Sequence, residues 1–133
     1  MDSNVYSNQT TRKAFDAVTL SGTASDNRYE FGTEGFSKLT VDLGYAMGGG
    51  ESANKLAFTL EHSPDGGVNW FSLVIDSTST TSEITPRVWE ITGTNKLSVI
   101  VDIAYKLMRI SLTESGVATT AGTASVFYTI SGN

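Results

Sequence analysis

Cysteine is absent from the 133-residue sequence, and histidine occurs only once, as His62. Without cysteine the chain can form no disulfide and no thiolate metal site. His62 is followed directly by Ser63, but neighbouring residues of a strand point to opposite faces, so these side chains form no catalytic pair. Because an enzyme needs a positioned acid, base, nucleophile or metal, we expect no enzymatic activity, no cofactor and no bound metal.

Positive charge is also scarce. Nine Lys and Arg residues stand against 14 Asp and Glu, which gives a formal net charge of −5, and the longest basic run is Arg12-Lys13. Nucleic-acid-binding surfaces normally carry a basic stripe, so we expect no nucleic-acid partner.

Long apolar runs are missing as well. None approaches the roughly 20 residues that cross a bilayer as a helix. Residues 1–4 have neither the basic nor the apolar region of a signal peptide. We therefore expect no membrane partner and synthesis in the cytoplasm.

Small and β-branched residues take the place of the missing charge. The chain has 16 Ser, 18 Thr and 13 Gly but only 2 Pro. β-Branched side chains suit a pleated surface and glycine suits turns, so the composition predicts an all-β protein.

Apolar and polar residues alternate along several segments, as in half-buried strands. The pattern predicts eight strands, at residues 15–20, 37–43, 55–62, 68–75, 83–91, 96–103, 106–113 and 123–131. Their apolar faces supply the expected interior, namely Leu39, Val41, Leu56, Phe58, Leu60, Val99, Val101, Ile110, Leu112 and Tyr128.

Eight short strands in one domain predict an antiparallel β-sandwich. We favour a jelly roll of about eight strands, and an immunoglobulin-like sandwich is the alternative. The turn Ser63-Pro64-Asp65-Gly66-Gly67 is the strongest turn signal in the chain. It predicts a hairpin that pairs residues 56–62 with residues 68–75.

Residues 1–14 are mostly polar and show no period. We expect a flexible N-terminal arm over residues 1–14 and a single sandwich domain over residues 15–133. Val5 and Tyr6 are candidate anchors on a partner, with Arg12 and Lys13 as a small basic patch beside them. A frayed terminus is the alternative interpretation.

Aromatic residues at predicted edges and loops are the remaining candidates for an interface. Trp89 lies in the segment that Pro86 interrupts, and Tyr105 lies at the next hairpin. Outward-facing rings at Trp70, Trp89 or Tyr105 would suit either a protein interface or a sugar-binding platform.

Residues 56–70 comprise an alternating strand, the Ser63–Gly67 turn and a segment that carries Trp70. This arrangement resembles small virion proteins of tailed bacteriophages, in which a strand, S-x-D-G and a Trp-bearing strand follow one another. Residues 105–113 and 121–126 are similar to the closing hairpin of such proteins, whereas residues 1–36 lie outside the resemblance.

The resemblance implies a capsid decoration (cement) protein, a structural component of the virion that binds and stabilises the capsid lattice. Such proteins are often jelly rolls that trimerise, so the implied partners are the major capsid protein or other virion proteins and further copies of this chain. The implied location is the virion, after synthesis in the host cytoplasm. A carbohydrate-binding module of a tail or adhesion apparatus is the alternative function.

Overall fold

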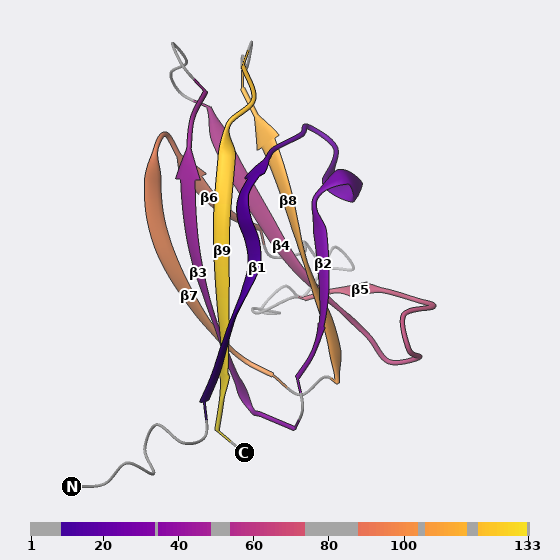
Figure 1. The fold of residues 1–133 in the computed structure, drawn as a ribbon. Helices are drawn as coiled ribbons and strands as arrows, with labels where there is room; N and C mark the ends of the chain where they lie inside the picture. Colours follow the sequence, from indigo (N-terminus) through magenta and orange to yellow (C-terminus); the bar gives the residue numbers. More distant parts are fainter. Residues whose placement is uncertain are drawn as a thin grey trace, which may run out of the picture.

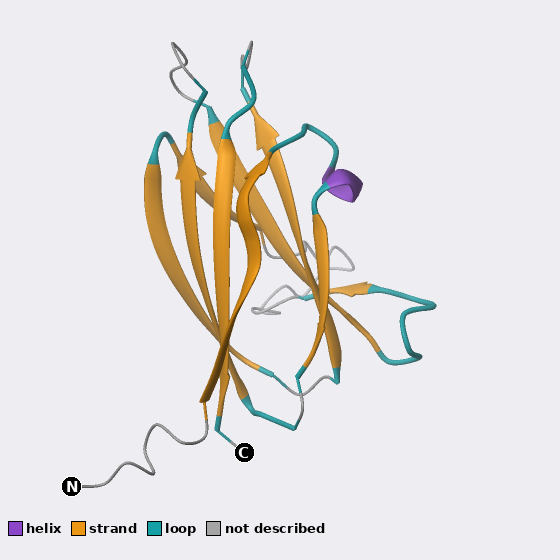
Figure 2. Cartoon of the chain, in the orientation of Figure 1, coloured by secondary structure: helices purple, strands orange, loops and turns teal. Residues whose placement is uncertain are grey.

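The computed structural model describes residues 9–33, 35–48, 54–73, 88–103, 106–116 and 120–132. These residues form nine strands in two antiparallel sheets that pack face to face, as Figure 1 shows. The one helical element among them is a short 3-10 turn, η1 (Ala24–Asp26), which is the purple segment in Figure 2. The predicted all-β sandwich is therefore confirmed.

The first sheet has four strands and the second has five. The four-stranded sheet has the order β1 (Gln9–Thr19), β9 (Thr123–Ser131), β3 (Lys38–Ala46), β7 (Asn95–Asp102). The five-stranded sheet has the order β2 (Arg28–Gly32), β8 (Leu107–Ser115), β4 (Lys55–Ser63), β5 (Phe71–Ser72), with β6 (Val88–Thr92) also paired to β4.

Strand pairing is nested from the ends of the chain towards its middle. β1 pairs with β9, β2 with β8, β3 with β7 and β4 with β6, and every pair is antiparallel. Successive pairs alternate between the two sheets, so the chain folds like one long hairpin wrapped into two layers. This topology is a jelly roll, and it decides between the two predicted sandwiches.

The core lies between the two sheets. Nine of the ten predicted interior residues are buried, and the tenth, Val99, is half-buried and packs against them. Phe58, Leu39 and Ile110 have no exposed surface. Alternation along a strand was therefore a reliable guide to the buried face, because side chains alternate between the two faces of a sheet.

The N-terminal part of the sandwich begins earlier than the sequence predicts. Residues 9–14, expected in the arm, belong to β1, where Arg12 lies opposite Tyr128 and Lys13 opposite Phe127. Backbone pairing with β9 holds this polar segment at the sheet edge, so it does not need an apolar face. The register of β1 shifts between Lys13 and Phe15 and again between Phe15 and Val18. Residues 1–8, with Val5 and Tyr6, lie outside the described residues.

Two further elements differ from the prediction. β2 (Arg28–Gly32) forms between the strands predicted at residues 15–20 and 37–43, where no strand was expected. The hairpin after Ser63 is antiparallel as predicted, but β5 contains only Phe71 and Ser72, paired with His62 and Glu61. Residues 68–70 remain in the turn, and residues 74–75 lie outside the described part of the chain.

Candidate functional site

The turn between β4 and β5 is held together by its own side chains. The Ser63 hydroxyl donates to Asp65 Oδ1 (2.8 Å) and accepts the amide of Gly67 (2.8 Å). Asp65 in turn accepts the backbone amide of Asn69 at 2.8 Å and its side-chain amide at 2.6 Å. We call residues 63–70 the pinned turn.

Hydrogen bonding also lowers the pKa of the carboxyl group in the pinned turn. The backbone amide of Asn69 is the largest cause that lowers the pKa of Asp65 below its ordinary value, followed by the Asn69 side chain and the Ser63 hydroxyl. Bonds donated to a carboxylate favour its ionised form. The Asp65 carboxylate therefore stays ionised to a lower pH than an ordinary aspartate does.

Glycine is required where the chain reverses. Gly66 has φ +75° and Gly67 has φ +98°, conformations that residues with a Cβ rarely adopt. The Pro64-Asp65-Gly66-Gly67 sequence therefore determines the path of the turn, as the sequence predicted.

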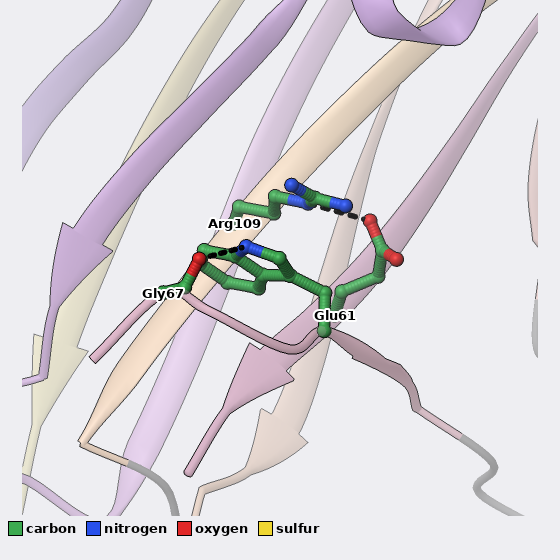
Figure 3. Close-up of polar contacts among 4 residues, drawn as sticks. Glu61, Gly67 and Arg109 are labelled. Atoms are coloured by element: carbon green, nitrogen blue, oxygen red, sulfur yellow. Dashed lines mark hydrogen bonds and ion pairs between the residues drawn. The ribbon is translucent and has the colours of Figure 1, made fainter. Parts of the chain in front are cut away.

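An aromatic and ionic cluster fixes the pinned turn to the outer face of the five-stranded sheet. Trp70 Nε1 donates to the carbonyl of Gly67 (3.2 Å), and the Arg109 guanidinium lies 4.3 Å from the centroid of the Trp70 ring. Arg109 Nε also donates to Glu61 Oε1 at 2.7 Å, as Figure 3 shows. The Arg109 and Glu61 side chains are only 13% and 17% exposed, so this ion pair is shielded from solvent.

The pinned turn and the strand β5 that follows it present apolar side chains to solvent. Val68 is 78% exposed and Phe71 is 52% exposed. In Figure 1 the segment before β5 extends sideways from the five-stranded sheet, away from the four-stranded sheet. A pre-ordered segment with exposed apolar groups is suited to binding another protein, because little conformational entropy is lost on contact.

A groove crosses the outer face of the four-stranded sheet. It has a volume of about 780 Å³ and is lined by residues of β3, β7 and β9 and by Thr94. Small residues such as Gly44 and Ser125 line it, alongside the larger Phe127, Asp42 and Lys96. Phe127 is 40% exposed, and Lys13 Nζ lies 5.1 Å from its ring centroid. The groove thus combines an aromatic ring with charged and hydroxyl groups.

The predicted interface residues do not form one cluster. Lys13 lies on β1, forms an ion pair with Asp16 (3.3 Å) and covers Phe127. Trp89 belongs to the other sheet, where its ring stacks on Phe58 at 4.9 Å and packs against the core. Arg12 lies beside Lys13 on β1. Val5, Tyr6 and Tyr105 lie outside the described residues.

A buried carboxylate, Glu114, is a polar feature that the sequence did not reveal. Glu114 is 7% exposed, and its Oε2 accepts the Tyr45 hydroxyl at 2.5 Å. The amide of Gly122 donates to both carboxylate oxygens, at 2.9 and 3.2 Å. These bonds join β3, β8 and Gly122, the residue directly before β9. Glu114 therefore links the two sheets inside the molecule.

Neither a metal centre nor a membrane helix is found in the described part of the chain. Its His, Asp and Glu residues form no group of three that could hold a metal ion. None of its helices has the length and apolar character needed to cross a membrane.

Comparison with known proteins adds no family. The chain matches no protein-family model, and no curated protein is similar to it in sequence.

Proposed function

We propose that this chain is a structural virion protein of a tailed phage, a decoration protein that binds and stabilises the capsid lattice. One observation supports it most. The residues on which the resemblance to phage virion proteins depends all belong to the pinned turn, namely Ser63, Asp65, Gly66, Gly67 and Trp70. Val68 is exposed within this turn, and Phe71 is exposed directly after it in β5. The role is binding, with no catalytic step.

Fold and charge are compatible with this role. Jelly rolls recur in viral capsid proteins as well as in lectins. The net charge of −5 disfavours contact with packaged DNA and suits the outside of a shell. In this proposal the chain is made in the host cytoplasm and has its place in the virion.

The proposed partners are the major capsid protein, other virion proteins and further copies of this chain. The resemblance suggests a trimer, and residues 1–8, with Val5 and Tyr6, remain the proposed anchor. Arg12 and Lys13 are part of β1, so they would contribute to attachment only from the sheet edge.

Co-sedimentation with empty shells of the same phage tests the proposal. The wild-type chain should pellet with shells, whereas the double variant Val68→Ser/Phe71→Ser should lose at least about tenfold in affinity, because two exposed apolar contacts are removed. Val88→Ser is the matched control, since Val88 is 46% exposed on the same sheet but outside the turn. Wild-type protein that stays in the supernatant would refute the proposal.

Carbohydrate binding is the second candidate, and the groove on the four-stranded sheet favours it. Sugars are held by an aromatic face together with polar groups, and Phe127, Asp42 and Lys96 line this groove. Trp89 is less suitable than the sequence suggested, because its ring stacks on Phe58. A glycan array tests this function. Binding of the wild-type chain to a glycan, loss of that binding in Phe127→Ala, and no co-sedimentation with shells would together favour it.

A further inference from the structure

β7 is a regular strand at the edge of the four-stranded sheet. Its eight residues pair with β3 without a register shift, and none of the other described strands pairs with its opposite side. Figure 1 shows β7 at the outer edge of the sheet. Ile100 is 69% exposed on this strand. Unprotected edges of this kind are templates for pairing with another chain.

The backbone groups that face away from β3 can be assigned. The amide of Ile103 donates to the Ser37 carbonyl at 2.7 Å, one step beyond the Lys38–Asp102 pair. Because hydrogen-bonded positions alternate in an antiparallel ladder, the odd-numbered residues of β7 bond to β3. The amide of Lys96 accordingly bonds to the side chain of Asn95 (2.8 Å). The backbones of Ser98, Ile100 and Asp102 therefore point to the open edge.

Charge favours one self-pairing register of this edge. If two copies pair antiparallel about a two-fold axis at Val99, Lys96 lies opposite Asp102 of the second copy, and the contact occurs twice by symmetry. Ser98 then lies opposite Ile100, and the two Ile100 side chains become diagonal neighbours on the outer face. Moving the axis to Ser98 or Ile100 loses both Lys–Asp contacts.

We propose that two copies of this chain associate through β7 in this register, which joins their four-stranded sheets into one continuous sheet. The partner is a second copy, since the charged ends of β7 complement each other under two-fold symmetry. Asp102 already contacts Lys38 at 3.0 Å on the exposed surface, so it would lie between two ammonium groups. The inference does not rest on the proposed function, and it predicts a dimer in place of the trimer.

Sedimentation equilibrium of the full chain measures the association. We expect a concentration-dependent mass that approaches twice 14.2 kDa. Lys96→Asp and Asp102→Lys should each weaken dimerisation about tenfold, because like charges then face each other twice. The double variant K96D/D102K should restore association relative to either single variant, since the opposite charges are exchanged but still paired. The restoration is partial, because D102K also removes the contact with Lys38. Both side chains are exposed, so the variants are expected to fold.

Disulfide trapping tests the register separately, and the chain has no cysteine of its own. The two Val99 residues would form a non-hydrogen-bonded pair with Cα atoms about 4.5 Å apart, within disulfide range. Val99→Cys should therefore form a linked dimer on mild oxidation, whereas the control Thr11→Cys, exposed on β1, should not. The proposal would be overturned if the wild-type chain were strictly monomeric or trimeric. It would also be overturned if the chain dimerised but Lys96→Asp and Asp102→Lys left the dimerisation constant unchanged.

Discussion

At the scale of single residues, the packing around Glu114 explains why position 122 is glycine. A Cβ at Gly122 would lie 2.5 Å from Glu114 Oε2 and 2.6 Å from the Ala46 carbonyl. These atoms cannot retreat easily, because one is backbone and the other belongs to a buried carboxylate held by Tyr45. The link that Glu114 makes between the sheets thus depends on a residue with no side chain.

We predict that Gly122→Ala lowers the free energy of unfolding by about 1–3 kcal/mol, the usual range for overpacking. Denaturant titration measures it. Gly44→Ala is the matched control, because its Cβ would meet nothing closer than 3.7 Å, and it should change stability little. Equal effects of the two substitutions would contradict the packing argument.

We predict that the hydrogen bonds of Asp65 make the stability of the protein depend on pH in the acid range. Its pKa is lowered in the folded state, chiefly by the Asn69 backbone amide. Its contribution is therefore present above the unfolded pKa near 3.8 and is lost as pH falls through the lower folded value. As the pH is lowered below about 5, the wild type should lose stability more steeply than Asp65→Asn. Thermal melts of both proteins at successive pH values measure the difference.

At the scale of elements, strands with a buried and an exposed face were predictable. Residues 38–46, 55–63 and 123–131 form strands within three residues of the expected bounds. β1 extends beyond its apolar part because its polar start, residues 9–14, is stabilised by pairing with β9. Such pairing leaves no local pattern. β2 is short and lies among turn residues, which concealed Tyr29 and Phe31 as strand residues.

The candidate site was predictable only in part, because some of its contacts also join segments that are far apart in the sequence. The Ser63–Gly67 turn follows from local residue types, each with its own conformational preference. The contact of Arg109 with Trp70 joins segments far apart in sequence, and the groove depends on three strands that meet only in the folded sheet. No local sequence pattern marks either feature.

Two truncations separate the arm from β1. Removing residues 1–14 should lower the free energy of unfolding by at least about 1 kcal/mol, roughly 3–6 °C in Tm, because it removes backbone pairing from Gln9 to Lys13. Removing residues 1–8 should leave Tm nearly unchanged but weaken attachment to shells. Calorimetry and co-sedimentation measure the two effects. Full shell affinity after removal of residues 1–8 would identify a frayed terminus.

At the scale of the whole molecule, one core connects both sheets. Phe58 lies on β4 with no exposed surface and Leu39 lies on β3 in the opposite sheet, both within the same cluster. Among the described residues, the buried apolar side chains of both sheets form this one cluster. Domains of this size with one core usually unfold in a single cooperative step.

We predict that the jelly roll unfolds as one unit and that Phe58→Ala lowers its stability by about 3–5 kcal/mol, as expected for truncation of a buried aromatic.

Variants with a single tryptophan test whether the core and the pinned turn unfold together. Trp70→Phe leaves Trp89, which stacks on Phe58 in the core, and Trp89→Phe leaves Trp70, which lies under Arg109 on the outer face. For each variant, the denaturant transition followed by tryptophan fluorescence should coincide with the transition followed by far-ultraviolet circular dichroism. The midpoints of the two variants can differ, because each substitution changes stability itself. An earlier transition for Trp70 alone would show that the pinned turn melts independently of the sandwich, and a loss below about 1 kcal/mol in Phe58→Ala would contradict its place at the centre of the core.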